Sequence, residues 1–297
     1  MAQNELVRGL DVLREVSGCV KSCVEKIVSS VGLIEEESAL LPGKMLRPRF
    51  GARLVEGALE AERAETLVRL FAAVEIAHTA SLCHDDVIDK AGLRRGAPSF
   101  WRSAGVSGAI LVGDLLLCDA MRMVLDSAGG RYVESFVSKI SEICAAEAEQ
   151  EITLRGEPLD ERTCLRLARS KTGPFFAFVG LVSSGDDGDL SLALEEAGYR
   201  VGAAYQLADD LLDADGDEKE IGKTLGTDRG RGKFTLARFS REAVLDDICG
   251  LCRGALECVK EWPEVRGRVS DYLSSDLGEV FERHAPLAGL CRELKKG

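Results

Sequence analysis

Residues 67–89 read LVRLFAAVEIAHTASLCHDDVID, a largely apolar stretch that ends in three aspartates. Its length and its apolar residues at helical spacing predict a long buried helix, which we place at residues 64–89. Asp85 and Asp89 are four residues apart, so they share one face of that helix. Negative charges near the C-terminal end of a helix oppose its dipole. The cluster therefore costs stability unless a cation binds there.

Helical spacing of apolar residues continues along the rest of the chain. We predict further helices at residues 4–30, 106–127, 131–154, 159–183, 189–214, 240–260 and 264–293. Gly, Pro and Asp cluster in the predicted loops, at residues 42–48, 90–98, 183–189 and 215–233. Aromatic residues make up only 5 % of the chain, which favours helices over strands. We expect one all-α domain that spans residues 1–297.

Composition and charge exclude several classes of protein. The net charge of −12 argues against nucleic acid as a partner. No charge-free apolar run reaches about 18 residues, so we expect no transmembrane helix. The N-terminus lacks the apolar core of a signal peptide, and we expect ten reduced cysteines in a cytoplasmic protein. Cys249 and Cys252 have zinc-like spacing without a matching second pair, so helix-face thiols are the preferred interpretation.

A second aspartate cluster repeats the pattern of the first. Residues 205–213 read YQLADDLLD, and Asp209 and Asp213 again share a helix face. Carboxylates one turn apart suit Mg²⁺, which keeps several waters and takes its remaining ligands from substrate phosphates. One such pair alone is more often a solvated acidic face. The repetition inside apolar sequence favours metal binding.

Basic residues lie in segments that precede, separate or follow the two clusters. They are Lys44, Arg47, Arg94, Arg95, Lys171, Lys223 and Lys233. Guanidinium and ammonium groups are the usual phosphate binders in proteins. Each of these residues taken singly is more often a surface charge. Their positions favour a diphosphate bridged by Mg²⁺, plus a second anionic group that cations hold without metal.

The chain resembles the trans-isoprenyl (polyprenyl) diphosphate synthases over about residues 40–240. The matching segments are GKMLRP, HTASLCHDDVID, LRRG, VGDLLL, KTG, YQLADDLLD and GKTLGTDRGRGK. The resemblance implies a bundle of long helices around a central active-site cavity, assembled as a homodimer. It also implies condensation of isopentenyl diphosphate with an allylic diphosphate to an all-trans polyprenyl diphosphate, with about three Mg²⁺ ions per site.

The same resemblance implies roles for individual residues. The metal ligands would be Asp85, Asp89 and Asp209, supported by Asp86, Asp210 and Asp213. The cations that hold the allylic diphosphate would be Arg94, Lys171 and Lys223. The isopentenyl diphosphate site would contain Lys44, Arg47, His78 and Arg95. Thr172 and Gln206 would lie near the reacting carbons, and Lys233 would help to close the site.

Two features of this sequence qualify the resemblance. A lone histidine in an apolar helix is more often a satisfied core residue, so the ligand role of His78 depends on the resemblance. The family often has a Gly-Glu or Gly-Gln pair on its central helix, followed by Gln or Asp. Residues 146–152 read AEAEQEI here and depart from that pattern.

Small residues before the first aspartate cluster predict a long product. In this family, short-chain enzymes tend to carry aromatic residues four or five positions before the first aspartate. Ser81 and Ala80 occupy those positions, and Phe71 is the first aromatic residue further up the helix. A deep apolar pocket stabilises a growing chain by about 0.8 kcal/mol per buried CH₂. We therefore expect a product longer than farnesyl diphosphate.

The sequence bears on four alternatives to a synthase that makes a long product. A class I terpene cyclase shares the all-α fold and one aspartate cluster, but the second cluster and the isopentenyl-site residues favour elongation. A short-chain synthase that makes farnesyl or geranylgeranyl diphosphate stays open. A non-catalytic subunit of a heteromeric enzyme would tend to lose the aspartates, and a cation-buffering scaffold leaves the basic loops unexplained.

Overall fold

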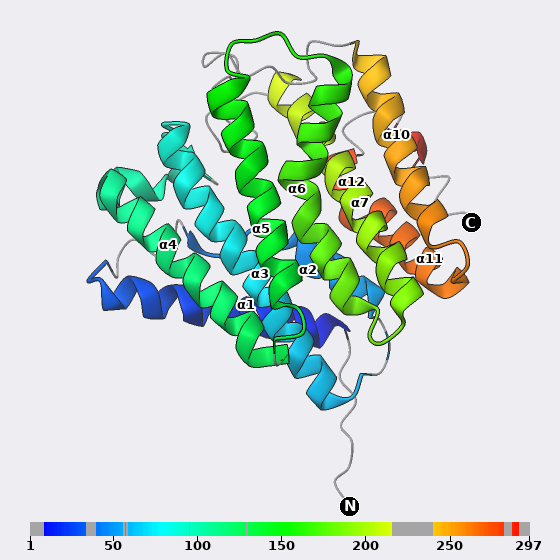
Figure 1. Ribbon diagram of the computed structural model, residues 1–297, viewed down its shortest axis with the longest axis horizontal. Helices are drawn as coiled ribbons and strands as arrows, with labels where there is room; N and C mark the ends of the chain where they lie inside the picture. The colour runs from blue at the N-terminus through cyan, green and yellow to red at the C-terminus, as the bar shows by residue number, and fades with distance from the viewer. Residues whose placement is uncertain are drawn as a thin grey trace, which may run out of the picture. The chain divides into compact units, whose positions relative to one another are not determined.

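The computed structural model describes residues 9–33, 40–55, 57, 59–94, 96–128, 130–215, 240–281 and 287–290. Helices dominate these ranges, which confirms the predicted all-α class (Figure 1). The described residues divide into two compact units. The first contains residues up to 48 and from 57 to 134, and the second contains those at 49–55, 135–215 and from 240 onward. That they form one domain stays a prediction.

The first unit is built on α3 (Ala61–Ile88), which packs against α1 (Gly9–Ser30) and α4 (Phe100–Ala128). Helix α1 buries valines at four-residue intervals, beginning with Val12 and ending with Val28. This spacing lines one face of a helix and buries it in the core. Helix α4 contains a kink at Gly105, whose φ of 73° lies outside the helical region. The regular part of α4 therefore begins near residue 106, where the sequence predicted its start.

A short hairpin follows α3. Its strands are β1 (Leu93–Arg94) and β2 (Ala97–Pro98), and Arg94 pairs with Ala97. The sequence predicted only a loop at residues 90–98, because two-residue strands are too short to show alternation. Gly96 allows the tight turn with a φ of +77°. The indole nitrogen of Trp101 donates to the carbonyl oxygen of Ala91 at 2.7 Å and ties the segment to the start of α4.

The second unit contains most of the remaining elements. They are α5 (Val133–Ala148), the π-helix η2 (Glu149–Thr153), α6 (Glu161–Ser183), α7 (Gly188–Asp215), α10 (Arg241–Cys258), α11 (Pro263–Asp271), the π-helix η4 (Tyr272–Asp276) and α12 (Gly278–Phe281). Helix α7 packs against both α6 and α10. The side chain of Asp160 accepts a hydrogen bond from the amide of Thr163 and caps the start of α6.

Helix α2 spans Leu46–Leu54, and its first residues fall in the loop predicted at residues 42–48. Pro48 lies in its first turn, where the missing amide hydrogen is tolerated. Phe50 on α2 packs its ring against Phe176 and Tyr272, with centroids 6.0 and 5.0 Å away. Arg53 donates to Asp276 at 2.8 Å. These contacts fix the part of α2 that belongs to the second unit.

Among the helices that the structure describes, only α3 has the length and apolar composition of a membrane-spanning helix. In its most apolar 18-residue window, 72 % of the residues lie buried inside the protein. The core helix of a folded unit has this same composition.

Candidate active site

The first aspartate cluster lies at the C-terminal end of α3. Asp85 and Asp89 are partly exposed, whereas Asp86 is buried, with 3 % of its surface exposed. Asp89 is the C-cap residue of the helix, and its amide donates to the carbonyl oxygen of Asp85. The exposed pair is the one that a helix places on a single face. Asp85 and Asp89 can therefore reach a ligand, while Asp86 points into the protein.

The buried aspartate is paired with an arginine from the hairpin. Arg94 donates to one oxygen of Asp86 through Nε, at 3.0 Å, and through Nη2. Burial alone would lower the pKa of Arg94, but the hydrogen bond and the charge of Asp86 outweigh it and raise the pKa. The pair fixes the hairpin against α3. It also holds the guanidinium group where the charges of Asp85 and Asp89 help to raise its pKa.

His84 connects the cluster to α4. Its Nε2 lies 3.2 Å from the carbonyl oxygen of Ile110 and 3.3 Å from a carboxylate oxygen of Asp114. A carbonyl oxygen only accepts, so Nε2 carries the hydrogen. A Cβ atom at Gly113 would come within 2.4 Å of that nitrogen. The glycine and aspartate of the VGDLLL segment thus make room for His84 and bind it.

One of the predicted isopentenyl-site residues, Arg47, lies beside α3, the helix that carries another, His78. Arg47 lies 3.8 Å from a carboxylate oxygen of Glu75, and Glu75 precedes His78 by one turn of α3. Lys44 is exposed. Sequence reasoning did not assign a role to Glu75. The signal was its isolated negative charge in an apolar helix, because a charged group is buried there only when it is paired.

The second aspartate cluster lies on α7 and is linked to α6 by a chain of hydrogen bonds. The hydroxyl of buried Thr172 donates to Oε1 of Gln206. Nε2 of Gln206 then donates to Asp210 at 2.8 Å. The chain fixes the Gln206 amide and orients Asp210, while Asp209 precedes it on the same helix turn. Two residues assigned near the reacting carbons are therefore in direct contact.

Lys171 is held by two residues from the segment that departed from the family pattern. Its ammonium group lies 2.7 Å from Oε1 of Gln150 and 2.8 Å from a carboxylate oxygen of Glu147. Gln150 belongs to the π-helix η2, whose extra residue per turn redirects side chains. The structure thereby gives AEAEQEI a role: it supplies the partners of Lys171.

The sequence matches the polyprenyl synthetase family model over residues 34–241. The chain belongs to the polyprenyl synthetase family. It is 30 % identical over 229 residues to the octaprenyl diphosphate synthase of Escherichia coli (strain K12), covering 75 % of this chain and 70 % of that one. It is 33 % identical over 240 residues to heptaprenyl diphosphate synthase component 2 of Bacillus subtilis (strain 168), covering 80 % and 67 %.

A solved structure shares the family fold. It is the polyprenyl synthase from Caulobacter crescentus CB15 complexed with calcium and isoprenyl diphosphate, with a TM-score of 0.71 and 24 % identity. The match covers 92 % of this chain and 98 % of that one. The resemblance inferred from the sequence motifs is therefore confirmed at the level of family and fold.

Several residues predicted from the family pattern lie outside the described residues. These are Arg95, Lys223 and Lys233, together with the side chain of Asp213. The two residues of the predicted pocket floor are described. Ala80 is buried with 1 % exposure, and the hydroxyl of Ser81 donates to the carbonyl oxygen of His78 at 2.8 Å. No bulky side chain occupies either position of the floor.

The cysteines near the clusters are thiols rather than thiolate ligands. Burial raises the pKa of Cys83 to about 12, with smaller contributions from Asp86 and Asp85. Burial likewise raises the pKa of Cys164 to about 11, and the charge of Asp210 adds to it. On α10, Cys252 is buried and Cys249 half-buried. Within the described ranges, no three His, Cys, Asp or Glu side chains are grouped to hold a metal.

The donors in both clusters fit Mg²⁺ better than a softer metal. Each cluster offers carboxylate oxygens, which are the ligands that Mg²⁺ prefers. Mg²⁺ needs only one or two protein carboxylates when a substrate phosphate and water complete its shell. The donor set of this member of the family therefore fits a metal that is shared with a diphosphate.

Proposed function

We propose that the protein condenses isopentenyl diphosphate with an allylic diphosphate, head to tail, to make an all-trans polyprenyl diphosphate. Membership of the polyprenyl synthetase family makes it a prenyltransferase. The observation that carries the proposal is that each unit contains partly exposed aspartates and a cation held in place by neighbouring side chains. In the first unit these are Asp85, Asp89 and Arg94, and in the second they are Asp209 and Lys171.

We assign the metal ligands to Asp85, Asp89 and Asp209, with support from Asp210 and Asp213, for about three Mg²⁺ ions per site. Bound Mg²⁺ supplies Lewis-acid neutralisation of the charge on the departing diphosphate. Arg94 and Lys171, with Lys223, bind that diphosphate through charge-assisted hydrogen bonds. Asp86, which the sequence grouped with the supporting metal ligands, contributes by holding Arg94 in place.

The remaining predicted residues hold the second substrate. Lys44, Arg47, His78 and Arg95 are assigned to isopentenyl diphosphate, and Glu75 orients Arg47 for this task. Thr172 and Gln206 lie where the allylic carbon becomes cation-like and is attacked by the double bond. A proton is then lost to the released diphosphate. Lys233 helps to close the site, and the apolar helices exclude the water that would quench the cation.

The activity is tested by incubating the protein with labelled isopentenyl diphosphate and each of dimethylallyl, geranyl, farnesyl and geranylgeranyl diphosphate. We expect label to enter a linear polyprenyl diphosphate with Mg²⁺, to stop with EDTA, and to resume when Mg²⁺ is restored. Mass spectrometry identifies the product. A cyclic hydrocarbon would favour the terpene cyclase, and no incorporation with any primer would contradict the proposal.

Ala80→Phe is expected to shorten the product. Ala80 is buried on α3, five residues before Asp85, and a phenyl ring there fills the volume that a growing chain needs. We expect the wild-type product to exceed farnesyl diphosphate and the variant product to lose at least one isoprene unit, as measured by mass spectrometry. Ala61→Phe, at the exposed start of the same helix, serves as the control. An unchanged product from Ala80→Phe would rule out this pocket floor.

We also propose that the protein is cytoplasmic and forms a homodimer. An exposed apolar stripe on α4 supports the homodimer. The stripe consists of Leu111, Leu115 and Leu125, which are 62, 43 and 52 % exposed. The opposite face of α4 is buried through Val112, Leu116, Ala120 and Val124. A helix that is apolar on both faces, with one face exposed, is typical of a subunit interface.

Leu111→Glu is expected to convert the dimer to a monomer, because the interface would bury an unpaired charge. Leu192→Glu on α7 is the matched control, since Leu192 is 68 % exposed and lies outside the stripe. Sedimentation equilibrium measures both variants. A wild-type protein that is monomeric by itself would contradict the homodimer, and a dimeric Leu111→Glu variant would exclude this face.

A further inference from the structure

Helices α6 and α7 touch backbone to backbone (Figure 1). A Cβ atom at Gly198 would lie 2.4 Å from the carbonyl oxygen of Phe176. One at Gly202 would lie 2.6 Å from the Cα of Gly173 and 2.9 Å from the carbonyl oxygen of Thr172. Side chains that interlock normally fix the register of two packed helices. The glycine contacts themselves supply no interlocking side chains, although the rings of Phe176 on α6 and Tyr205 on α7 pack with centroids 6.4 Å apart. Polar contacts beside the glycines therefore add to what fixes the register.

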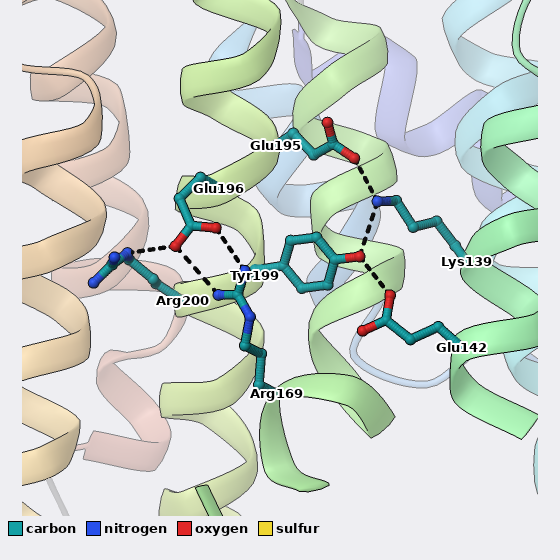
Figure 2. A network of polar contacts seen from close by, with 7 residues as sticks. All are labelled: Lys139, Glu142, Arg169, Glu195, Glu196, Tyr199 and Arg200. Carbon is teal, nitrogen blue, oxygen red and sulfur yellow. Dashed lines mark hydrogen bonds and ion pairs between the residues drawn. The ribbon is translucent and has the colours of Figure 1, made fainter. Parts of the chain in front are cut away.

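A polar network beside this contact joins three helices (Figure 2). Its centre is Tyr199 on α7, whose hydroxyl donates to Glu142 on α5 at 2.5 Å and accepts from Lys139 at 2.9 Å. Lys139 also donates to Glu195, one turn before Tyr199. Arg169 on α6 lies 4.2 Å from the centroid of the Tyr199 ring. The tyrosine therefore contacts α5 through its hydroxyl and α6 through its ring.

The network is balanced in charge and half-buried, with Lys139 buried within it. The seven residues drawn in Figure 2 carry three cations, three carboxylates and one phenol. Arg169 is held by Glu196, which also accepts from Arg200. Burial, followed by Glu142 and Glu195, raises the pKa of Tyr199, so the hydroxyl keeps its proton and donates. Buried polar groups whose partners are all present favour one packing arrangement over others.

The network lies directly next to the hydrogen bonds of the second aspartate cluster. Tyr199 packs on Gly173, where a Cβ atom would lie 2.8 Å from its ring. Gly173 follows Thr172, and Gln206 follows Tyr199 by two turns on the same face of α7. A slide or rotation of α7 that moves Tyr199 would also displace Gln206 from Thr172.

We infer that Tyr199 is a positioning residue of the reaction: bound to Glu142 and Lys139, it sets the register of α7 on α6 and thereby aligns Gln206 and Asp210 with Thr172. This inference rests on the proposed function, because the alignment matters only if those residues act on the substrates. Tyr199 touches no reacting atom. Its effect passes through the Thr172–Gln206 hydrogen bond.

The test is a double-mutant cycle in kcat, measured on the full chain with saturating isopentenyl diphosphate, allylic diphosphate and Mg²⁺. Tyr199→Phe keeps the ring and removes the hydroxyl, and Thr172→Val removes the hydroxyl that binds Gln206. We expect each single change to lower kcat about tenfold, since small misplacements are costly in catalysis. The double variant should be no slower than the slower single variant. Tyr132→Phe, in the first unit, is the matched control and should leave kcat unchanged.

A second pair of variants probes the same bond from α5. Glu142→Leu removes the acceptor of the Tyr199 hydroxyl and should reproduce the loss in kcat. Glu142→Gln keeps an acceptor and should retain most of the wild-type rate. A residue that only stabilised the fold would lower the melting temperature in both members of the pair and leave kcat of the folded enzyme unchanged.

The outcomes separate this inference from the proposed function. A wild-type protein that consumes no isopentenyl diphosphate overturns the proposed function. An active wild type with an unaltered kcat in Tyr199→Phe overturns the inference alone. Multiplicative losses in the double variant also overturn it, because they would show that Tyr199 acts independently of Thr172.

Discussion

Asp209→Asn is expected to lower kcat by about 10²–10³-fold and to leave the fold intact. Removing one preorganised group that stabilises transition-state charge typically costs this much. The asparagine keeps the shape of Asp209 but removes the negative charge with which the proposed ligand would attract Mg²⁺. Asp209 is partly exposed on α7, so its replacement should not destabilise the core. Asp85→Asn on α3 should give a loss of the same order.

The measurement is the steady-state rate of isopentenyl diphosphate incorporation at saturating Mg²⁺, alongside a thermal melt. Asp126→Asn is the control, because Asp126 is exposed near the end of α4 and outside both clusters. It should retain the wild-type rate. Equal rates for Asp209→Asn and Asp126→Asn would show that the second cluster has no part in catalysis.

Arg94→Met is expected to have the second largest effect, on stability and on substrate binding together. It leaves Asp86 charged and buried, and breaking a buried ion pair from one side typically costs about 3–5 kcal/mol. It also removes a cation assigned to the allylic diphosphate, so the KM for that substrate should rise by about tenfold or more. Urea unfolding and steady-state kinetics measure the two effects separately.

Two further variants sharpen the result. Arg69→Met breaks the exposed pair of Arg69 with Glu65 on α3 and should change the free energy of unfolding by less than about 1 kcal/mol. The double variant Arg94→Met with Asp86→Asn removes both charges and should regain most of the stability, while the raised KM persists. A normal KM in the double variant would mean that Arg94 is only structural.

The elements that the sequence predicted best are those with long periodic patterns. Helix α3 was placed within three residues at its start, at 64 against Ala61, because its apolar residues keep helical spacing over a long stretch. The hairpin strands and the start of α2 were missed because each contains too few residues to show a periodic pattern of apolar side chains. The π-helix η2 was read as a continuation of α5, since one inserted residue barely disturbs the pattern over residues 131–154.

Motifs identified the candidate site, but they did not give the pairings within it. The sequence grouped Asp86 with Asp85 and Asp89, yet the helix turns Asp86 inward to Arg94. Nothing in the spacing predicts that Lys171 is held by Glu147 or that Tyr199 joins three helices. Such contacts join residues far apart in the chain. They depend on how the helices pack, which local periodicity does not encode.

The central proposal is that the aspartates of each cluster take part in Mg²⁺-dependent binding of an allylic diphosphate. Calorimetric titration with a non-hydrolysable thio-analogue of farnesyl diphosphate tests it without requiring turnover. The account predicts binding to the wild type only when Mg²⁺ is present, and weakened binding to both Asp85→Asn and Asp209→Asn. Binding that persists in EDTA, or wild-type affinity in either variant, would contradict it.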